Sequence, residues 1–129
     1  MKFLVLIGLI MLLGCSYSTR QDVDQFVSVN KGYIKPEDVS VFADCLIDGF
    51  SQLNIMLTAV TPRKEVRANG YRVETTIENK LLIMSADVLN DGKVELFEYK
   101  NSHSLFGVWS TEGEKEAFKN CLNQHKNNK

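Results

Sequence analysis

The order of apolar and polar residues predicts a helix over residues 36–53. Apolar side chains recur there at steps of three and four, which places them on one face of a helix. This face comprises Val39, Phe42, Ala43, Leu46, Phe50 and Leu53, whereas Asp44, Asp48 and Gln52 take the far side. Pro36, Glu37 and Asp38 suit a first turn, because proline is tolerated there and acidic residues interact favourably with the helix dipole.

A second helix is predicted to begin after Thr111. Thr111 and Glu114 match a capping box, in which Thr111 caps the helix and the Glu114 side chain returns to the N–H of Thr111. The apolar face of this helix comprises Ala117, Phe118, Cys121, Leu122 and His125. Cys121 therefore lies on the apolar face of the second helix, and Cys45 lies beside that of the first.

The residues between the two helices change to the two-residue period that is typical of strands. Asn69-Gly70 and Asn90-Asp91-Gly92 are turn signals, and Asn79-Lys80 separates two further apolar runs. The predicted strands are residues 71–77, 81–89 and 94–99, with 105–110 as a candidate edge strand. Residues 54–60 fit a helix or a strand, and the threonines and valine before Pro62 favour a strand.

These elements predict an α+β fold of two layers. An antiparallel β-meander of about four to five strands packs against an N-terminal and a C-terminal helix, in a sheet that is solvated on one face. At 129 residues the chain forms one such domain, over residues 36–126, with residues 127–129 as a disordered tail. Phe26, Val27 and Val29 are a candidate short first strand or flap before this domain.

The segment from Met1 to Gly14 has the pattern of a secretory signal peptide. Lys2 is followed by twelve residues without a charged or strongly polar side chain, and the run ends at a small residue. A helix that crosses a bilayer needs about 20 apolar residues. The run is therefore too short to span a membrane, and the polar residues 16–24 cannot extend it.

Leu12-Leu13-Gly14-Cys15 resembles the lipobox of bacterial lipoproteins, although Leu13 is bulkier than the residue usual there. The resemblance implies that Cys15 receives a diacylglyceryl thioether and becomes the new N-terminus, with residues 15–35 as the lipidated cysteine and its tether. An uncleaved anchor and ordinary cleavage near Gly14 to Ser18 are the alternatives. Ser16 after the cysteine implies the outer membrane in enteric-type bacteria, with the domain facing the periplasm.

Three cysteines are an awkward number for an exported protein. If Cys15 carries lipid, Cys45 and Cys121 are left as a pair, and an oxidising compartment would join them in a disulfide. The alternative is two separately buried thiols that behave as small apolar side chains. Parity and compartment together favour the disulfide.

The composition does not indicate a nucleic-acid-binding protein. The formal net charge is −1 and no polybasic run is present, so the sequence lacks the electrostatic footprint of a nucleic-acid or anionic membrane surface. Arg63, Lys64 and Arg67, next to Pro62, form the one basic cluster. A solvated loop explains this cluster, and a contact with lipid headgroups or an acidic partner is the alternative.

The polar residues form no recognisable catalytic or metal-binding motif. His103 lies between two serines but without a nucleophile elbow. Asp87, Asp91, Gly92 and Glu98 fall at positions 1, 5, 6 and 12 of a calcium loop. Position 3 is Leu89 and the flanking segments are predicted strands, so turn chemistry explains these residues better. We therefore predict no catalytic residue, no metal ligand and no cofactor.

The aromatic residues Phe106 and Trp109 are the candidate binding surface. If residues 105–109 form an edge strand, these two side chains lie on opposite faces, and an exposed one marks a surface for a partner. The default alternative is that both side chains pack in the core. We predict a membrane-anchored envelope lipoprotein that acts by binding a protein partner, for example an immunity, exclusion or inhibitor protein or a subunit of an envelope complex. The alternative is a small periplasmic hydrolase or metal-dependent enzyme that uses the His103 region.

Overall fold

The computed structural model describes residue 20 and residues 23–55, 58–77, 81–100 and 111–126. Its two long helices are α2 (Val39–Ser51) and α4 (Glu112–His125), and two short 3₁₀ turns are η1 (Val23–Gln25) and η2 (Pro36–Asp38). The strands are β1 (Phe26–Tyr33), β2 (Asn54–Ile55), β3 (Thr58–Arg67), β4 (Gly70–Ile77), β5 (Leu81–Leu89) and β6 (Lys93–Tyr99).

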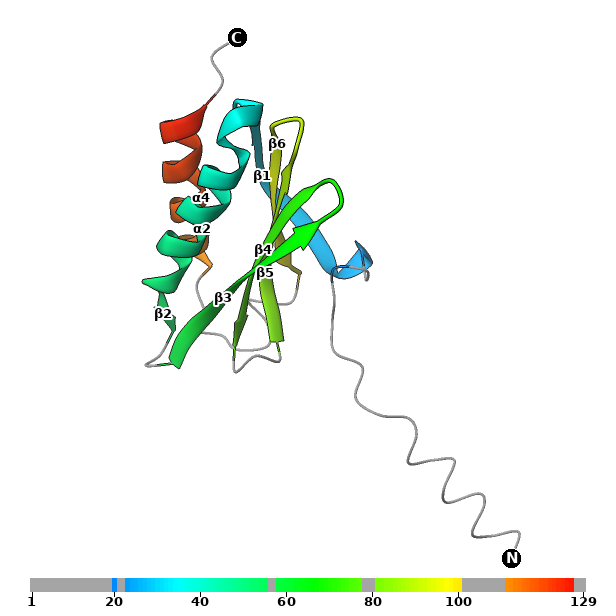
Figure 1. Ribbon diagram of the computed structural model, residues 1–129. Coiled ribbons are helices and arrows are strands. Elements are labelled where there is room, and N and C mark those ends of the chain that lie inside the picture. Colours follow the sequence, from blue (N-terminus) through cyan, green and yellow to red (C-terminus); the bar gives the residue numbers. More distant parts are fainter. Residues whose placement is uncertain (1–19, 21–22, 56–57, 78–80, 101–110, 127–129) are drawn as a thin grey trace, which may run out of the picture.

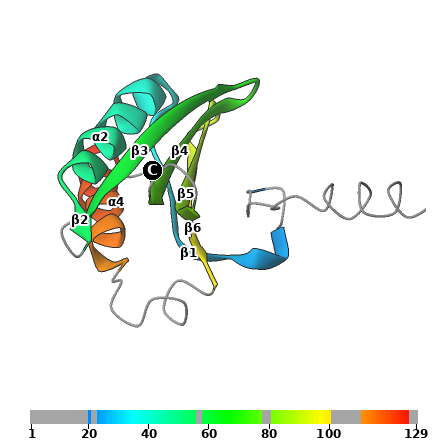
Figure 2. The ribbon, with the colours of Figure 1, turned by 90° about the horizontal axis from the view of Figure 1, so that it is seen from below.

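The strands form one antiparallel sheet in the order β1-β6-β5-β4-β3-β2. Both helices lie side by side on the same face of this sheet, as Figures 1 and 2 show. From β2 to β6, each strand pairs with the next one along the chain, as a meander does. The predicted α+β fold of two layers, with a helix before and a helix after the meander, is therefore confirmed.

Strand β1 is the largest difference from the sequence-based expectation. Residues 26–33, which we placed in the tether, pair with β6 along its whole length, from Phe26 opposite Tyr99 to Tyr33 opposite Lys93. A register shift between Ser28 and Asn30 interrupts the two-residue alternation. This bulge explains why the local pattern predicted no more than a short strand or flap, because alternation on either side of it is out of phase.

The turns between strands follow the predicted signals. Gly92 adopts a φ of +96° and its N–H donates to the carbonyl of Leu89, which closes the turn between β5 and β6. Gly70 begins β4 directly after the turn and has a φ of +148°. A Cβ atom there would lie 2.1 Å from the carbonyl oxygen of Val88, so the close approach of β5 also requires glycine.

The core lies between the helices and the sheet. Its fully buried members include Phe42, Leu46 and Phe50 of α2, Phe118 of α4, and Val73, Ala86, Val88 and Leu96 of the sheet. The rings of Phe42 and Phe118 meet edge to face, with centroids 5.7 Å apart, an arrangement that aromatic pairs favour. The helix predicted over residues 36–53 is α2 with the 3₁₀ turn η2 before it.

The predicted capping box at the start of α4 is wrong. Thr111 precedes the helix, but its side chain makes no capping hydrogen bond. Instead, its hydroxyl Oγ1 donates to Glu98 Oε1 of β6 at 2.5 Å. The Glu114 side chain is buried and does not return to the start of the helix. Tertiary packing against β6 therefore replaces the local cap that the two residues would form in an isolated helix.

Candidate functional site

A disulfide between Cys45 and Cys121 joins the two helices, as predicted. The sulfur atoms are 2.08 Å apart and the Cα atoms 6.0 Å apart. Cys121 is almost completely buried and Cys45 is half-buried. The disulfide thus links α2 to α4, and the side chain of Cys45 is partly exposed at the outer surface of the helix layer.

The helices approach each other closely beside this disulfide because small residues face each other. A Cβ atom on Gly49 of α2 would lie 3.0 Å from the Cβ of Ala117 on α4. At the start of α4, a Cβ atom on Gly113 would lie 2.7 Å from Leu53 Cδ2. Larger side chains at these positions would push the helices apart, since packed interiors have no room for added methyl groups.

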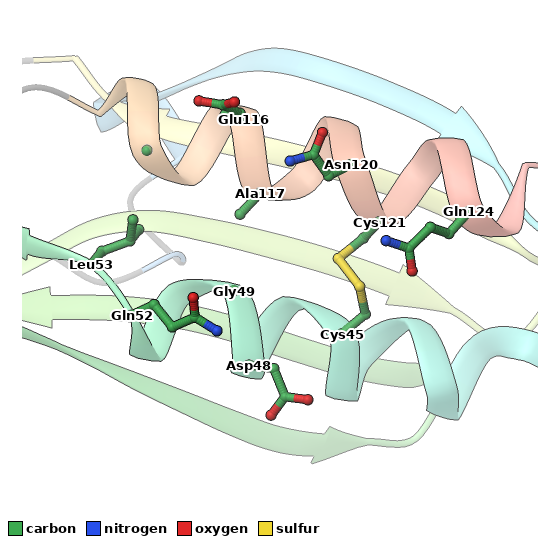
Figure 3. A pocket seen from close by; sticks show the side chains of 11 residues that line it. Cys45, Asp48, Gly49, Gln52, Leu53, Glu116, Ala117, Asn120, Cys121 and Gln124 are labelled. Atoms are coloured by element: carbon green, nitrogen blue, oxygen red, sulfur yellow. A yellow bond between two sulfur atoms is a disulfide. The ribbon is translucent and has the colours of Figure 1, made fainter.

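A shallow groove of about 470 Å³ runs between α2 and α4 above the disulfide. Figure 3 shows the disulfide in the groove, with Asn120 and Gln124 on either side of it along α4. The groove is lined by Cys45, Asp48, Gly49, Gln52, Leu53, Gly113, Glu116, Ala117, Asn120, Cys121 and Gln124. Asp48 and Gln52, which the sequence analysis placed on the solvent side of the helix, are therefore the α2 wall of this groove.

The groove offers hydrogen-bonding groups and negative charge. The carboxylates of Asp48 and Glu116 accept hydrogen bonds, and the carboxamides of Gln52, Asn120 and Gln124 both donate and accept them. Its described lining includes no lysine, arginine, histidine, serine or threonine. This arrangement suits recognition of backbone amides and basic side chains.

Negative charge extends over the whole helix layer. Residues 36–51 and 112–125 carry seven acidic and two basic side chains, a formal net charge of −5. The whole chain has a net charge of only −1, so the remainder is basic. This asymmetry arises from folding, because the two acidic segments are far apart in the sequence and lie together in space (Figure 1).

A second group of carboxylates is buried beneath the start of α4. Glu98 accepts the hydrogen bond from Thr111, and its other oxygen lies 3.4 Å from Lys115 Nζ. Glu114 is 1% exposed and its Oε1 has no hydrogen-bond partner. Burial, and to a lesser degree the nearby Glu98 carboxylate, raise the pKa of Glu114. Because both side chains are shielded from solvent, this pair acts on stability and is not an accessible reaction centre.

The opposite face of the sheet carries an ionic cluster centred on Asp87. Arg20 Nη2 donates to Asp87 Oδ2 at 3.0 Å, and Arg72 Nε donates to Asp87 Oδ1 at 2.8 Å. The Arg20 guanidinium also stacks over Phe97, with its central carbon 3.7 Å from the ring centroid, and lies 5.6 Å from that of Phe26. Such stacking stabilises a partly desolvated guanidinium. Asp87 therefore accepts hydrogen bonds from two arginines.

The other sequence-based site residues have simpler roles or lie elsewhere. Cys15, His103, Phe106 and Trp109 lie outside the described residues. Asp91 Oδ1 accepts from the N–H of Lys93 and stabilises the β5–β6 turn. Among the described residues, no three His, Cys, Asp or Glu side chains are grouped so as to hold a metal ion.

The basic cluster predicted as a solvated loop is part of strand β3. Arg63 donates to Glu74, 2.9 Å away, and Arg67 donates to Glu65, whereas Lys64 points to the helix side and donates to Asp44 of α2. The hydrogen bond with Asp44 raises the pKa of Lys64. The alternation of a strand therefore divides this cluster between the two faces of the sheet.

Sequence reasoning missed the polar walls of the groove, although a signal was present. Glu116, Asn120 and Gln124 recur at steps of four, which places them in one row along a helix. Asp48 and Gln52 form the equivalent row on the other helix. Both rows line the same groove because the Cys45–Cys121 disulfide joins the two helices and each row runs alongside one of the cysteines.

No protein-family model, curated protein or solved structure matches the chain. In the part of the chain that the structure describes, neither helix has the length and apolar character needed to cross a bilayer.

Proposed function

We propose that this protein is a lipid-anchored envelope lipoprotein that binds a protein partner through the groove between α2 and α4. The lipobox-like sequence Leu12-Leu13-Gly14-Cys15 supports the anchor, with Cys15 as the lipidated residue at the outer membrane. The disulfide supports an oxidising compartment such as the periplasm, because cytosolic thiols are kept reduced.

The observation that carries the binding role is the acidic, carboxamide-lined groove. Asp48 of α2 and Glu116 of α4 place one carboxylate on each outer rim of a cleft that the disulfide and the surrounding core hold in shape, and both carboxylates are directed away from the disulfide (Figure 3). A preformed groove binds without the entropic cost of ordering its walls. Its partner is a basic segment of an envelope protein, whose lysine or arginine side chains pair with these carboxylates.

The anchor is tested on the protein isolated from bacterial envelopes. Intact mass of its N-terminal peptide is expected to show diacylglyceryl and acyl groups on Cys15, and the protein is expected to enter the detergent phase on phase separation. Cys15→Ala is expected to stay as an unprocessed precursor or to become soluble. An exported protein whose Cys15 is unmodified would contradict the anchor.

The groove is tested with a photo-crosslinking amino acid placed at Asn120 or, as the matched control, at Lys119. Both positions are exposed on α4, but only Asn120 lines the groove. We expect a specific crosslink from position 120, to a segment rich in lysine or arginine, and none from position 119. The crosslink is expected to disappear when Asp48→Lys and Glu116→Lys are combined, and to persist in Glu37→Lys, which changes an exposed acidic residue away from the groove. Equal crosslinking from both positions would exclude the groove as the binding site.

A further inference from the structure

The face of the sheet opposite the helices, here called the open face, holds the start of the described chain. Arg20 reaches across it to Asp87 of β5 and over the Phe97 ring of β6. The Arg20 side chain is only 10% exposed. Figure 2 shows that η1, directly before β1, lies on the side of the sheet away from the helices. Arg20 thus holds the N-terminal segment against the open face. Its contacts with Asp87 and Phe97 are called the clamp below.

This clamp shortens the connection between the domain and Cys15. Five peptide steps separate Cys15 from Arg20, and at full extension they span at most about 18 Å. A tether running freely to residue 35 would allow the domain to turn in any direction. With Arg20 held on the open face, this face remains within a short distance of whatever surface Cys15 is attached to.

The charges of the open face suit an anionic surface. Residues that share a face follow from the strand registers, because directly paired residues point to the same side. The basic side chains of this face are Arg20, Lys31, Arg63, Arg67, Arg72 and Lys93, and the acidic ones are Glu65, Glu74, Asp87 and Glu95. Counted over these residues, the open face has a formal net charge of +2, or +1 when the exposed Asp24 of η1 on the same side is included, against −5 for the helix layer.

An exposed aromatic side chain on the open face also favours contact with a membrane surface. Tyr33 lies opposite Lys93 at the end of β1 and is 62% exposed. Tyrosine is enriched at membrane interfaces, because its ring is apolar while its hydroxyl remains hydrated. Lys31 is also exposed on the same strand and face. The positive charge of Lys31 and the ring of Tyr33 together suit the headgroup region of a membrane.

We propose that the open face lies against the anionic lipid headgroups of the membrane that holds Cys15, with the helix layer and its groove directed away from the membrane. This inference rests on the proposed lipid anchor. The occupant of the open face is the lipid surface, because a short clamped connection and opposite charge both bring that surface to it. The acidic helix layer is repelled by the same headgroups and stays accessible to a basic partner.

The orientation is tested by acylating surface lysines of the lipidated full-length protein with a water-soluble ester. The protein is compared in neutral detergent and in vesicles of phosphatidylethanolamine with phosphatidylglycerol. Labelling of Lys31 and Lys93 is expected to fall by about threefold or more in the vesicles, whereas Lys119 on α4 is expected to label equally in both. High salt is expected to restore part of the labelling, since ions screen the attraction.

The clamp is tested by Arg20→Ala beside Arg67→Ala. Both substitutions remove one positive charge from the open face, but only the first releases the N-terminal segment. We expect Arg20→Ala to abolish most of the protection of Lys31, and Arg67→Ala to retain it. Arg20→Gln is included because it preserves side-chain length, and near-ultraviolet circular dichroism verifies that each variant is folded.

Three results would overturn the inference. They are equal labelling of Lys31 and Lys119 in the vesicles, protection of Lys119 in place of Lys31, and protection of Lys31 already in detergent at high protein concentration, which would indicate a second copy on the open face. The mass of the Cys15 peptide is measured in the same sample. Absence of lipid there contradicts the proposed anchor, whereas a lipidated protein with uniform labelling contradicts the orientation alone.

Discussion

Different interactions stabilise the two faces of the sheet. On the helix-covered face, the side chains of Val73, Ala86 and Leu96 are completely buried against α2 and α4. On the open face, the neighbouring residues Arg72 and Asp87 form ion pairs that remain partly exposed. Each strand contributes to both faces, because successive side chains point in opposite directions.

The domain gains its stability mainly on the helix-covered face and retains freedom to interact on the open face. Burial of apolar surface and a covalent bond between helices are not weakened by charge screening, whereas partly exposed ion pairs are. The helix layer can therefore present a preformed groove. The open face, in contrast, carries charged side chains that can also interact with a surface outside the protein.

The largest effect is expected from removing the link between the helices. Cys45→Ala and Cys121→Ala should each lower the free energy of unfolding by about 2–5 kcal/mol, because the bond constrains the unfolded chain between two residues that are 76 positions apart. The melting temperature should fall by roughly 10 °C or more for a domain of this size. Thermal unfolding followed by circular dichroism measures both.

The double variant provides the control for this prediction. It should be no less stable than the single variants, since the two cysteines act as one unit. Alkylation of the unreduced, unfolded wild-type protein should leave both cysteines unlabelled. If both label readily without reductant, the helices are not linked and the large effect has another origin.

An intermediate effect is expected on the open face. Asp87→Ala should lower the free energy of unfolding by about 1–3 kcal/mol, because it leaves two partly buried guanidinium groups without their acceptor. Asp44→Ala is the matched control: its ion pair with Lys64 is shorter, at 2.6 Å, but Asp44 is 60% exposed. Exposed pairs contribute only about 0–1 kcal/mol. Chemical denaturation in urea compares the two, and equal losses would show that burial does not determine their strength.

The smallest effect on stability is expected from Glu114, a buried acidic residue on the helix-covered side of the sheet. Because burial raises the pKa of Glu114, the native state binds its proton more tightly than the unfolded chain. This contribution to stability is complete below pH 4.5, the ordinary value for the group, and is lost as the pH rises through the raised pKa of the native state. Glu114→Gln should therefore be more stable than wild type near neutral pH, with the difference shrinking toward pH 4.5. Urea denaturation of both proteins across this range tests it, and a difference that does not change with pH would contradict it.

The elements that could be predicted from the sequence are those whose signals are local. The three- and four-residue spacing of Val39, Phe42 and Leu46 predicted α2, and the turn at Asn90-Asp91-Gly92 lies where expected. Helical periodicity and turn chemistry depend on residues within a few positions of one another, so they can be recognised without knowing the fold. The pairing of Cys45 with Cys121 followed from the number of cysteines and the inferred compartment.

The contacts between distant residues could not be predicted and became visible in the folded structure. The bulge in β1 concealed a full edge strand, and Thr111 donates to Glu98 of a strand instead of capping its own helix. The clamp joins Arg20 to Asp87 across 67 positions. Such contacts form because the folded chain brings separate segments together and buries their polar groups, which must then find partners. Local sequence patterns do not encode those partners, and the groove and the open face both depend on them.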